Sequence, residues 1–341
     1  MLEQKIYEII AKEKLIENGD RLVLGVSGGP DSICMLTILY EIMKKNLIDF
    51  DMVVAHINHG LRENAKLDEE FVKDFCEKRQ ISCFVKYANI KEIASEEKRG
   101  LEETGRKIRY EFFDEILMKN YCNKIAIAHN NNDKSETILM NILRGTGIHG
   151  LIGMEKKNGK YIRPLLDIRR EEIEEYLRKQ GIEARHDESN NENIYTRNKI
   201  RNVVMPYLKK EFNPNLLQSF DRLSEIAKET EEYLQKQTET AYLEACLQEE
   251  NVTKNIEENR KNHAEITLDL KKFNSYEKIL QKRVILHAIQ KIFGSTKGIE
   301  KIHIEDMIKL CNNNIGNKFL TPNKNLKIVT QKKQLKIIAI S

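Results

Sequence analysis

The stretch Val23-Leu24-Gly25-Val26-Ser27-Gly28-Gly29-Pro30-Asp31-Ser32 decides the fold of this chain of 341 residues. Its first part is a short apolar run with β-branched residues, which predicts a strand. Two consecutive glycines then allow a tight turn, and Pro30 suits the first turn of a helix. Asp31 and Ser32 suit a helix cap or first turn. Such a loop presents free backbone N–H groups at a helix N-terminus, which predicts a phosphate site.

The motif SGGPDS at residues 27–32 differs from the commoner nucleotide-binding loops. It lacks the Lys-Ser/Thr pair of a Walker A loop and the third glycine of a dinucleotide fingerprint. It resembles instead the pyrophosphate loop of the N-type ATP pyrophosphatases. Those enzymes cleave ATP between its α- and β-phosphates and adenylate an oxygen of their substrate. The alternative is an ordinary strand, turn and helix.

Composition indicates a globular protein of two or three domains with a heavily charged surface: 40% of residues are apolar and 32% charged. No apolar stretch approaches the ~20 residues of a membrane span, and the N-terminus lacks a secretory signal, so we expect a cytoplasmic protein without a membrane partner. The six cysteines form no CxxC pair, which disfavours zinc and iron–sulfur sites. The net charge of +4 is too small to indicate a nucleic-acid partner by itself.

Strand and helix patterns alternate along the first 150 residues and predict a doubly wound parallel α/β sheet. Beyond the first strand, apolar runs predict strands at 51–56, 82–87 and 124–129. Ligands of such sheets bind at the carboxyl ends of the strands. Three polar stretches fall at those ends, so the sequence predicts one active site formed by residues 27–32, 56–59 and 129–133.

The remaining sequence predicts further elements and a division into domains. We expect a catalytic domain at 1–214, a helical linker region at 215–260 and a small α+β domain at 261–341. From Lys318 to the end the chain has six lysines and no acid. The elements expected within these parts are a helix at 173–179, a mobile loop at 185–198, a long charged helix at 216–248 followed by a linker, helices at 276–293 and 302–311, and strands within 319–340.

Several motifs together resemble one family, the tRNA(Ile)-lysidine synthetases. In chain order they are SGGPDS at 27–32, HINHGLR at 56–62, GRKIRYEFF at 105–113, AHNNNDKSETILMNILRGTGIHGL at 128–151, RPLL at 163–166 and RNKIRNVVMPYL at 197–208. They cover most of residues 20–210. The C-terminal part resembles the accessory domain of that family more weakly.

The resemblance implies an activity. The C2 oxygen of the wobble cytidine in a tRNA(Ile) with a CAU anticodon attacks the α-phosphate of ATP and releases pyrophosphate. The ε-amine of free L-lysine then attacks C2 and displaces AMP, leaving lysidine, which changes codon reading from AUG to AUA. The resemblance implies ATP and Mg²⁺ as cofactors, and it leaves a homodimer open.

The expected nucleotide-binding residues follow from the loop and the resemblance. The loop would hold the pyrophosphate group, and Asp31 is the best Mg²⁺ ligand within it, although a purely helix-capping role is the alternative. His56 is compatible with an adenine or ribose contact and equally with a structural role. The full set is Ser27, Gly28, Gly29, Pro30, Asp31, Ser32 and His56.

Three residues are expected to be catalytic. Arg106, on a predicted helix, would stabilise negative charge on the α-phosphate, or form a surface ion pair. Asp133 and Glu136 lie three residues apart at the start of a helix. Their carboxylates would bind the cytidine amino group or the ammonium groups of lysine, or accept a proton from the attacking amine. The alternative is that they only complement the helix dipole.

Basic residues along the chain are the expected tRNA contacts, with a solvated surface or a structural role as the alternative. Arg197 and Arg201 follow the predicted mobile loop and would become ordered when tRNA binds. The tail lysines would contact phosphates and give salt dependence without base specificity. The expected set is Arg62, Arg144, Arg197, Arg201, Lys327, Lys332 and Lys333.

One departure from the family pattern lies beside the expected acids. In the family a second histidine follows the residue equivalent to His129 and an acid precedes the equivalent of Asp133, whereas this chain has Asn130 and Asn132. Both keep hydrogen bonding but lose charge. Three rival hypotheses remain: a tRNA thiolation enzyme of the same fold, which the lack of paired cysteines disfavours, an adenylating ligase of a small metabolite, and a non-catalytic tRNA-binding protein.

Overall fold

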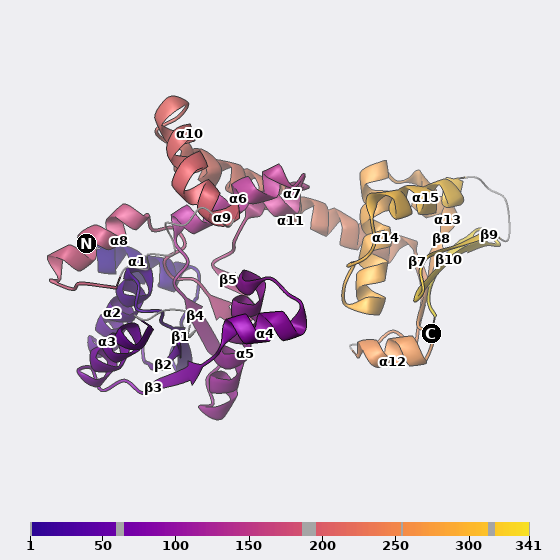
Figure 1. The fold of residues 1–341 in the computed structure, drawn as a ribbon. Helices are drawn as coiled ribbons and strands as arrows, with labels where there is room; N and C mark the ends of the chain where they lie inside the picture. The colour runs from indigo at the N-terminus through magenta and orange to yellow at the C-terminus, as the bar shows by residue number, and fades with distance from the viewer. Residues whose placement is uncertain (1, 59–64, 186–195, 254, 313–317, 341) are drawn as a thin grey trace. The chain divides into compact units, whose positions relative to one another are not determined.

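The computed structural model describes residues 2–58, 65–185, 196–253, 255–312 and 318–340 (Figure 1). The chain divides into two compact units, Met1–Ala227 and Lys228–Ser341. The domain boundaries predicted after residues 214 and 260 stay predictions. Among the described residues, no helix combines the length and the apolar character needed to cross a membrane.

The first unit is built on a six-stranded sheet with the order β3-β2-β1-β4-β6-β5. All neighbouring strands are parallel except β5 and β6, so the predicted parallel sheet is confirmed with one short antiparallel edge. The strands are β1 (Asp20–Gly25), β2 (Phe50–Asn58), β3 (Cys83–Tyr87), β4 (Lys124–Ile127), β5 (Lys157–Asn158) and β6 (Tyr161–Ile162).

Helices cover both faces of this sheet, and the side chains of β1 show why. Leu22 and Leu24 belong to one buried cluster, whereas Val23 belongs to another that includes Phe113 of α5. Because successive side chains of a strand point to opposite faces, an apolar run buried on both sides requires a helix layer on each face. The helices of this unit are α1 (Leu2–Lys12), α2 (Pro30–Lys44), α3 (Ala65–Glu77), α4 (Ile90–Glu97), α5 (Leu101–Lys119), α6 (Asn131–Leu143), α7 (Ile148–Ile152), α8 (Arg170–Lys179), α9 (Thr196–Lys199), a π-helical turn η2 (Ile200–Val204) and α10 (Met205–Glu211).

The strand order places the expected site. From β1 the chain adds β2 and β3 on one side, and β4 lies on the other side. The loops that leave the carboxyl ends of β1 and β4 therefore diverge and leave a crevice, where ligands of doubly wound sheets bind. The residues that follow these two strands are the SGGPDS loop and the start of α6, so the topology brings two of the expected polar stretches together.

Two sequence predictions fail in this unit. The helix α4 (Ile90–Glu97) was not predicted, because its eight residues carry only a short apolar pattern. The mobile loop predicted at 185–198 is wrong from Thr196 onward, where α9 begins. Residues 186–195 of that predicted loop lie outside the described part of the chain. The polar composition of the segment does not predict α9, because ion pairs of Arg197 rather than apolar burial stabilise this helix.

The second unit is a small α+β domain, as predicted. Its antiparallel sheet has the order β7-β8-β11-β10-β9, and one face packs on a core that includes Phe273 and Ile289. The linker predicted after residue 248 is wrong, because β7 and α12 lie there, and the long helix ends at Ala245 rather than at residue 248. Its elements, together with the helix that enters it, are α11 (Leu216–Ala245), β7 (Cys246–Glu250), α12 (Ile256–Lys261), β8 (Glu265–Asp269), α13 (Leu270–Ser275), α14 (Lys278–Phe293), α15 (Lys301–Asn312), β9 (Lys318–Asn323), β10 (Leu326–Gln331) and β11 (Gln334–Ala339).

Candidate active site

Residues 27–32, here called the glycine loop, connect β1 to α2 and are closed by two serine hydroxyls. The Oγ of Ser32 accepts the backbone N–H groups of Ser27 and Gly28, both at 3.2 Å, and donates to the Gly29 carbonyl at 2.9 Å. The N–H of Gly29 donates to the Oγ of Ser27 at 3.3 Å. Three consecutive N–H groups thus converge on oxygen atoms at the N-terminus of α2, whose N-cap makes no side-chain hydrogen bond. This is a site suited to phosphate oxygens.

The conformation of the loop requires glycine at Gly28. Its φ of +94° lies in the left-handed region, which residues with a side chain rarely adopt. A Cβ at this position would also lie 3.4 Å from the side chain of Val72 in α3. Helix α3 therefore packs close to the loop, but a Cβ would make only ordinary contact with it, so the glycine is needed for the turn.

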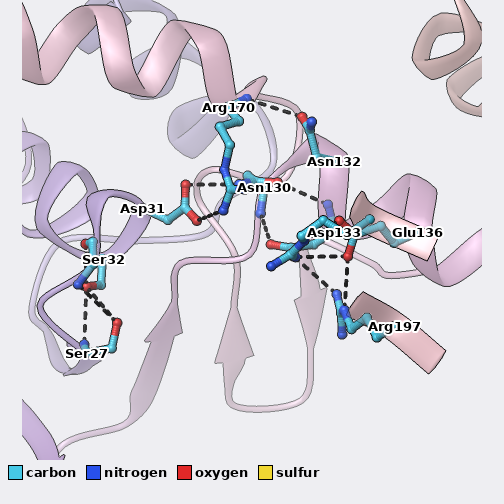
Figure 2. Close-up of polar contacts among 11 residues, drawn as sticks. Ser27, Asp31, Ser32, Asn130, Asn132, Asp133, Glu136, Arg170 and Arg197 are labelled. Atoms are coloured by element: carbon cyan, nitrogen blue, oxygen red, sulfur yellow. Dashed lines mark hydrogen bonds and ion pairs between the residues drawn. The ribbon is translucent and has the colours of Figure 1, made fainter. Parts of the chain in front are cut away.

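Asp31 connects the glycine loop to the start of α6 (Figure 2). It lies in the first turn of α2 and does not cap it, because the N-cap is Gly29. The Nδ2 of Asn130 donates to the Oδ1 of Asp31 at 3.0 Å. The Oδ1 of Asn130 accepts the backbone N–H of Asp133, also at 3.0 Å. Asn130 is thus the N-cap of α6 and at the same time the bridge between the two loops at the crevice.

Arg170, in the first turn of α8, lies on the other side of Asp31. Its Nη2 is 3.5 Å from the Oδ2 of Asp31, and its backbone N–H donates to the side chain of Asn132 at 3.2 Å. Burial, together with the charge of nearby Asp133, raises the pKa of Asp31 above its ordinary value, against the effect of Arg170. Two carboxylates therefore lie close enough at the crevice for their charges to interact, which favours a cation beside them.

Asp133 and Glu136 of α6 lie together with Arg197 and Arg201 in one ion-pair cluster. Arg201 pairs with Glu136 through two contacts, Nε to Oε1 at 2.7 Å and Nη2 to Oε2 at 2.9 Å, and its Nη2 also contacts the Oδ1 of Asp133 at 2.6 Å. Arg197 donates to Glu136 at 3.1 Å and to Asp133 at 3.2 Å. Burial alone would raise the pKa of Asp133, but the two arginines hold it below its ordinary value. Two predicted catalytic acids and two predicted tRNA contacts thus belong to one network.

The spacing of these residues explains the cluster. Asp133 and Glu136 are three residues apart, and the arginines are four apart, so each pair occupies one face of its helix. The arginines lie on the segment formed by α9, η2 and α10, and Arg201 lies in its π-helical turn. Such turns often occur at functional sites, because they change which side chains share a face.

His129 follows β4 and is held as a neutral imidazole. The Nε of Arg163 donates to its Nδ1 at 3.2 Å, and since a guanidinium only donates, this nitrogen carries no proton. Burial lowers the pKa of His129 to about 4. The remaining ring proton is therefore on Nε2, which makes the histidine a hydrogen-bond donor at the edge of the site.

Two other expected site residues have different neighbours. His56 is 3% exposed, and its Nδ1 donates to the carbonyl of Val26 at 2.9 Å, so the described contact supports the strand before the glycine loop. Arg106 is exposed on α5 and stacks on Tyr110, with its Cζ 4.8 Å from the ring centroid and its Nη2 3.2 Å from the hydroxyl. Within the described contacts Arg106 does not join the acidic cluster. The nucleotide and α-phosphate contacts expected of these two residues stay predictions.

The predicted tRNA contacts are spread over the chain. Arg62 lies outside the described residues, and Arg144 is exposed where α6 ends. In the second unit, Lys327 stacks on Phe319 with its Nζ 4.7 Å from the ring centroid. Lys332 and Lys333 form the exposed turn between β10 and β11. Their role in tRNA binding stays a prediction.

Sequence reasoning missed three residues of the site. The sequence marks Asn130 only as a departure from the family pattern, whereas it is 1% exposed and bridges the two loops. The other two are Arg163 and Arg170. Arg163 belongs to the RPLL motif, which offers a signal. Arg170 opens a ten-residue helix in which seven residues are charged, and nothing in its pattern marks it.

A cavity of about 570 Å³ opens between α6 and the arginine-bearing segment. Both charge signs line it, since Glu136 and Arg201 face it together. A molecule with an ammonium group and a carboxylate would find partners for both charges there. The lining residues are Asn132, Glu136, Arg170, Arg201, Asn202, Met205, Pro206 and Lys209.

The donor set at Asp31 fits a magnesium ion. Mg²⁺ usually takes one or two protein carboxylates and completes its shell with phosphate oxygens and water. Asp31 and Asp133 supply two carboxylates beside the loop that suits phosphate. The described residues contain no group of three or more His, Cys, Asp and Glu side chains placed to hold a metal ion by themselves.

Comparisons with known proteins agree with this geometry. The model of a family described as the PP-loop domain matches residues 1–208. The tRNA(Ile)-lysidine synthase of Clostridioides difficile is 40% identical over 97% of this chain and 69% of its own length. The tRNA(Ile)-lysidine synthase of Caldanaerobacter subterraneus is 37% identical over 94% of this chain and 65% of its own length. The chain thus spans about two thirds of the length of these curated relatives.

Among solved structures, the U34-tRNA thiolase NcsA of Methanococcus maripaludis, which holds a [4Fe-4S] cluster, is similar in fold. Its TM-score is 0.53 at 20% identity, and the match covers 65% of this chain and 78% of the thiolase. At this level of identity the likeness concerns the fold alone.

Proposed function

This chain belongs to the tRNA(Ile)-lysidine synthase family of PP-loop enzymes, and on that premise we propose that it joins free lysine to the wobble cytidine of a tRNA(Ile) with a CAU anticodon. The observation that carries the proposal is the bridge from Asp31 through Asn130 to Asp133. It supports the proposal because the glycine loop, which suits phosphate, lies beside a cluster of acids and arginines. The first suits ATP, and the second suits an amino acid and a base.

The first step adenylates the cytidine. The C2 oxygen of the base attacks the α-phosphorus of ATP, the bond between the α-phosphorus and the bridging oxygen breaks, and pyrophosphate leaves. The N–H groups of the glycine loop and the hydroxyls of Ser27 and Ser32 would hold the leaving group. Arg106 would stabilise charge on the α-phosphate. Phosphoryl-type transfer depends mainly on such positioning and charge neutralisation.

A magnesium ion bound at Asp31 would neutralise part of the charge on the phosphates. The raised pKa of Asp31 fits this role, because burial and the neighbouring Asp133 disfavour its bare negative charge.

The second step forms the new carbon–nitrogen bond. The ε-amine of lysine attacks C2, the C2–O bond breaks, and AMP leaves. The amine must lose a proton to become a nucleophile, and Asp133 or Glu136 would take it. Pairing with Arg197 and Arg201 lowers the pKa of Asp133 and so favours its ionised form, which is the state that accepts a proton or binds an ammonium group.

Thiolation on the same fold is the alternative. Four of the six cysteines, Cys34, Cys76, Cys122 and Cys311, are buried, and burial raises the pKa of the Cys34 and Cys311 thiols. Buried thiols with raised pKa values are poor nucleophiles. Cys83 is an exception, because it is half-buried and a hydrogen bond with the Cys76 thiol lowers its pKa. At the four buried positions the observations favour ligation of lysine. The cytoplasmic location and the homodimer stay predictions.

Incorporation of radiolabelled lysine tests the proposal. The full chain is incubated with ATP, Mg²⁺ and a transcript of tRNA(Ile) with a CAU anticodon, beside a methionine tRNA as control. We expect ATP-dependent label in the first tRNA alone. Pyrophosphate release without label in either tRNA would contradict the proposed substrate and retain the adenylating fold. The absence of both label and pyrophosphate, with the tRNA still bound, would favour a binding protein.

A further inference from the structure

Arg185 lies against the glycine loop, although no motif in the sequence marks it. Its backbone N–H donates to the carbonyl of Gly28 at 3.1 Å. Its own carbonyl oxygen lies 3.9 Å from the position that a Cβ on Gly29 would take. These two contacts fix the residue beside both glycines of the loop.

The side chain of Arg185 is oriented by a carboxylate from α3. Its Nε donates to the Oδ1 of Asp68 at 2.9 Å. Asp68 lies in the first turn of α3, and its backbone oxygen is 3.8 Å from the position of a Cβ on Gly28. The ion pair therefore holds the guanidinium next to the loop, with the side chain of Arg185 39% exposed. Among the described residues, neither terminal nitrogen of Arg185 has a partner.

A triphosphate bound at the glycine loop would need a positively charged side chain beside it. The glycine loop has no lysine, whereas the triphosphate it would bind carries several negative charges. The arginines across the crevice are already paired: Arg170 with Asp31, and Arg197 and Arg201 with the acids of α6. The two N–H₂ groups of Arg185, which have no partner among the described residues, match the oxygens of a phosphate in a forked geometry.

We propose that Arg185 binds the β- and γ-phosphates of ATP and the pyrophosphate product, and that Asp68 is the positioning residue that holds its Nε. This assignment rests on the proposed cleavage of ATP at the glycine loop. It differs from a merely structural ion pair in one respect. The guanidinium would contribute to the binding of nucleotides that carry β- and γ-phosphates and contribute nothing to the binding of AMP.

Nucleotide binding by the full chain tests this difference without turnover. Isothermal titration would compare α,β-methylene-ATP, which cannot be cleaved between its α- and β-phosphates, with AMP. For R185Q we expect binding of α,β-methylene-ATP to weaken by about 10- to 100-fold and binding of AMP to stay within about twofold. The matched control is R178Q, because Arg178 is an exposed arginine of α8, and this variant should bind both nucleotides as the unmodified chain does.

Two further variants separate phosphate binding from structural support. D68N breaks the ion pair but keeps the guanidinium, so its loss of analogue affinity should be clearly smaller than that of R185Q. R185K keeps a positive charge but not the forked pair of N–H₂ groups, so its loss of analogue affinity should lie between those of D68N and R185Q. Equal losses for D68N and R185Q, or equal losses for AMP and the analogue, would overturn the assignment. So would unchanged analogue binding in R185Q.

These binding experiments test the role of Arg185 separately from the proposed ligation of lysine. Selective loss of analogue binding in R185Q, in a chain that makes no lysidine, would support Arg185 and contradict only the identity of the final substrates. A failure of the unmodified chain to bind the analogue would overturn the assignment of Arg185 together with the role of the glycine loop.

Discussion

Replacement of Arg201 by glutamine should destabilise the unit Met1–Ala227 by about 3 kcal/mol. The side chain of Glu136 is only 3% exposed, and Arg201 makes both contacts of a forked pair with it, at 2.7 and 2.9 Å. Removal of one partner of a buried ion pair leaves the other charge without compensation and costs about 3–5 kcal/mol. The lower end applies here, because Arg197 stays 3.1 Å from the Oε2 of Glu136.

The double variant E136Q/R201Q tests whether the pairing is the cause. It removes both charges, so no ion is left buried alone, and its destabilisation should fall short of the sum of the single variants by about 2 kcal/mol. A purely steric role of the Arg201 side chain would give additive effects instead.

Hydrogen exchange measured by mass spectrometry can follow this unit separately. A loss of 3 kcal/mol corresponds to about 150-fold faster exchange of the protected amides of α6 (Asn131–Leu143). The amides of α14 (Lys278–Phe293), in the other compact unit, serve as the internal reference. R222Q is the matched control, since Arg222 is an exposed arginine bonded only to the hydroxyl of Ser219 among its described partners. Unchanged exchange in R201Q, or additive effects in the double variant, would refute the reasoning.

Three further results are expected. N130A should destabilise α6 by about 1 kcal/mol more than N130S does. Serine can still cap the helix, whereas both variants lose the amide that donates to Asp31. Hydrogen exchange of the α6 amides measures the difference. Between pH 6.5 and about 4 the unfolded chain binds a proton at His129 that the folded chain does not. The free energy of unfolding therefore falls as the pH falls through this window. Urea unfolding of H129N should show a weaker dependence of this free energy on pH. S27A should slow pyrophosphate release by at least about tenfold while tRNA binding persists, and unchanged release would contradict the role of the loop.

The architecture of the sheet and the position of the site follow from local sequence patterns. A β-branched apolar run, two glycines and a proline have few conformational solutions, so the strand, turn and helix at residues 20–44 were predictable. The rule that ligands bind at the carboxyl ends of parallel strands then selected the loop after β1 and the start of α6. Both lie at the crevice, where Asn130 connects them.

The contacts within the site were not predictable, because they depend on residues far apart in the chain. Arg201 and Glu136 are 65 positions apart, and their pairing requires the segment after residue 195 to fold as a helix against α6. The polar composition at residues 185–198 favours a loop on local grounds, and tertiary contacts reverse the preference: the ion pairs to α6 and the burial of Ile200 and Met205 against Ile138 and Leu139. Arg170 and Arg185 were not predictable for the same reason, since an isolated arginine in a charged chain carries no local pattern.

The charge balance of the site suits two substrates of opposite charge. Asp31, Asp133 and Glu136 supply three carboxylates, and each is paired with an arginine. ATP brings negative charge and needs the arginines, whereas the ammonium group of lysine needs the carboxylates. When a phosphate takes an arginine and an ammonium group takes the carboxylate that this arginine leaves, the two added charges offset each other and no buried charge is left uncompensated. A site with acids alone would bind lysine but repel the triphosphate, so in the proposed reaction the arginines on the segment after residue 195 would allow one crevice to serve both steps.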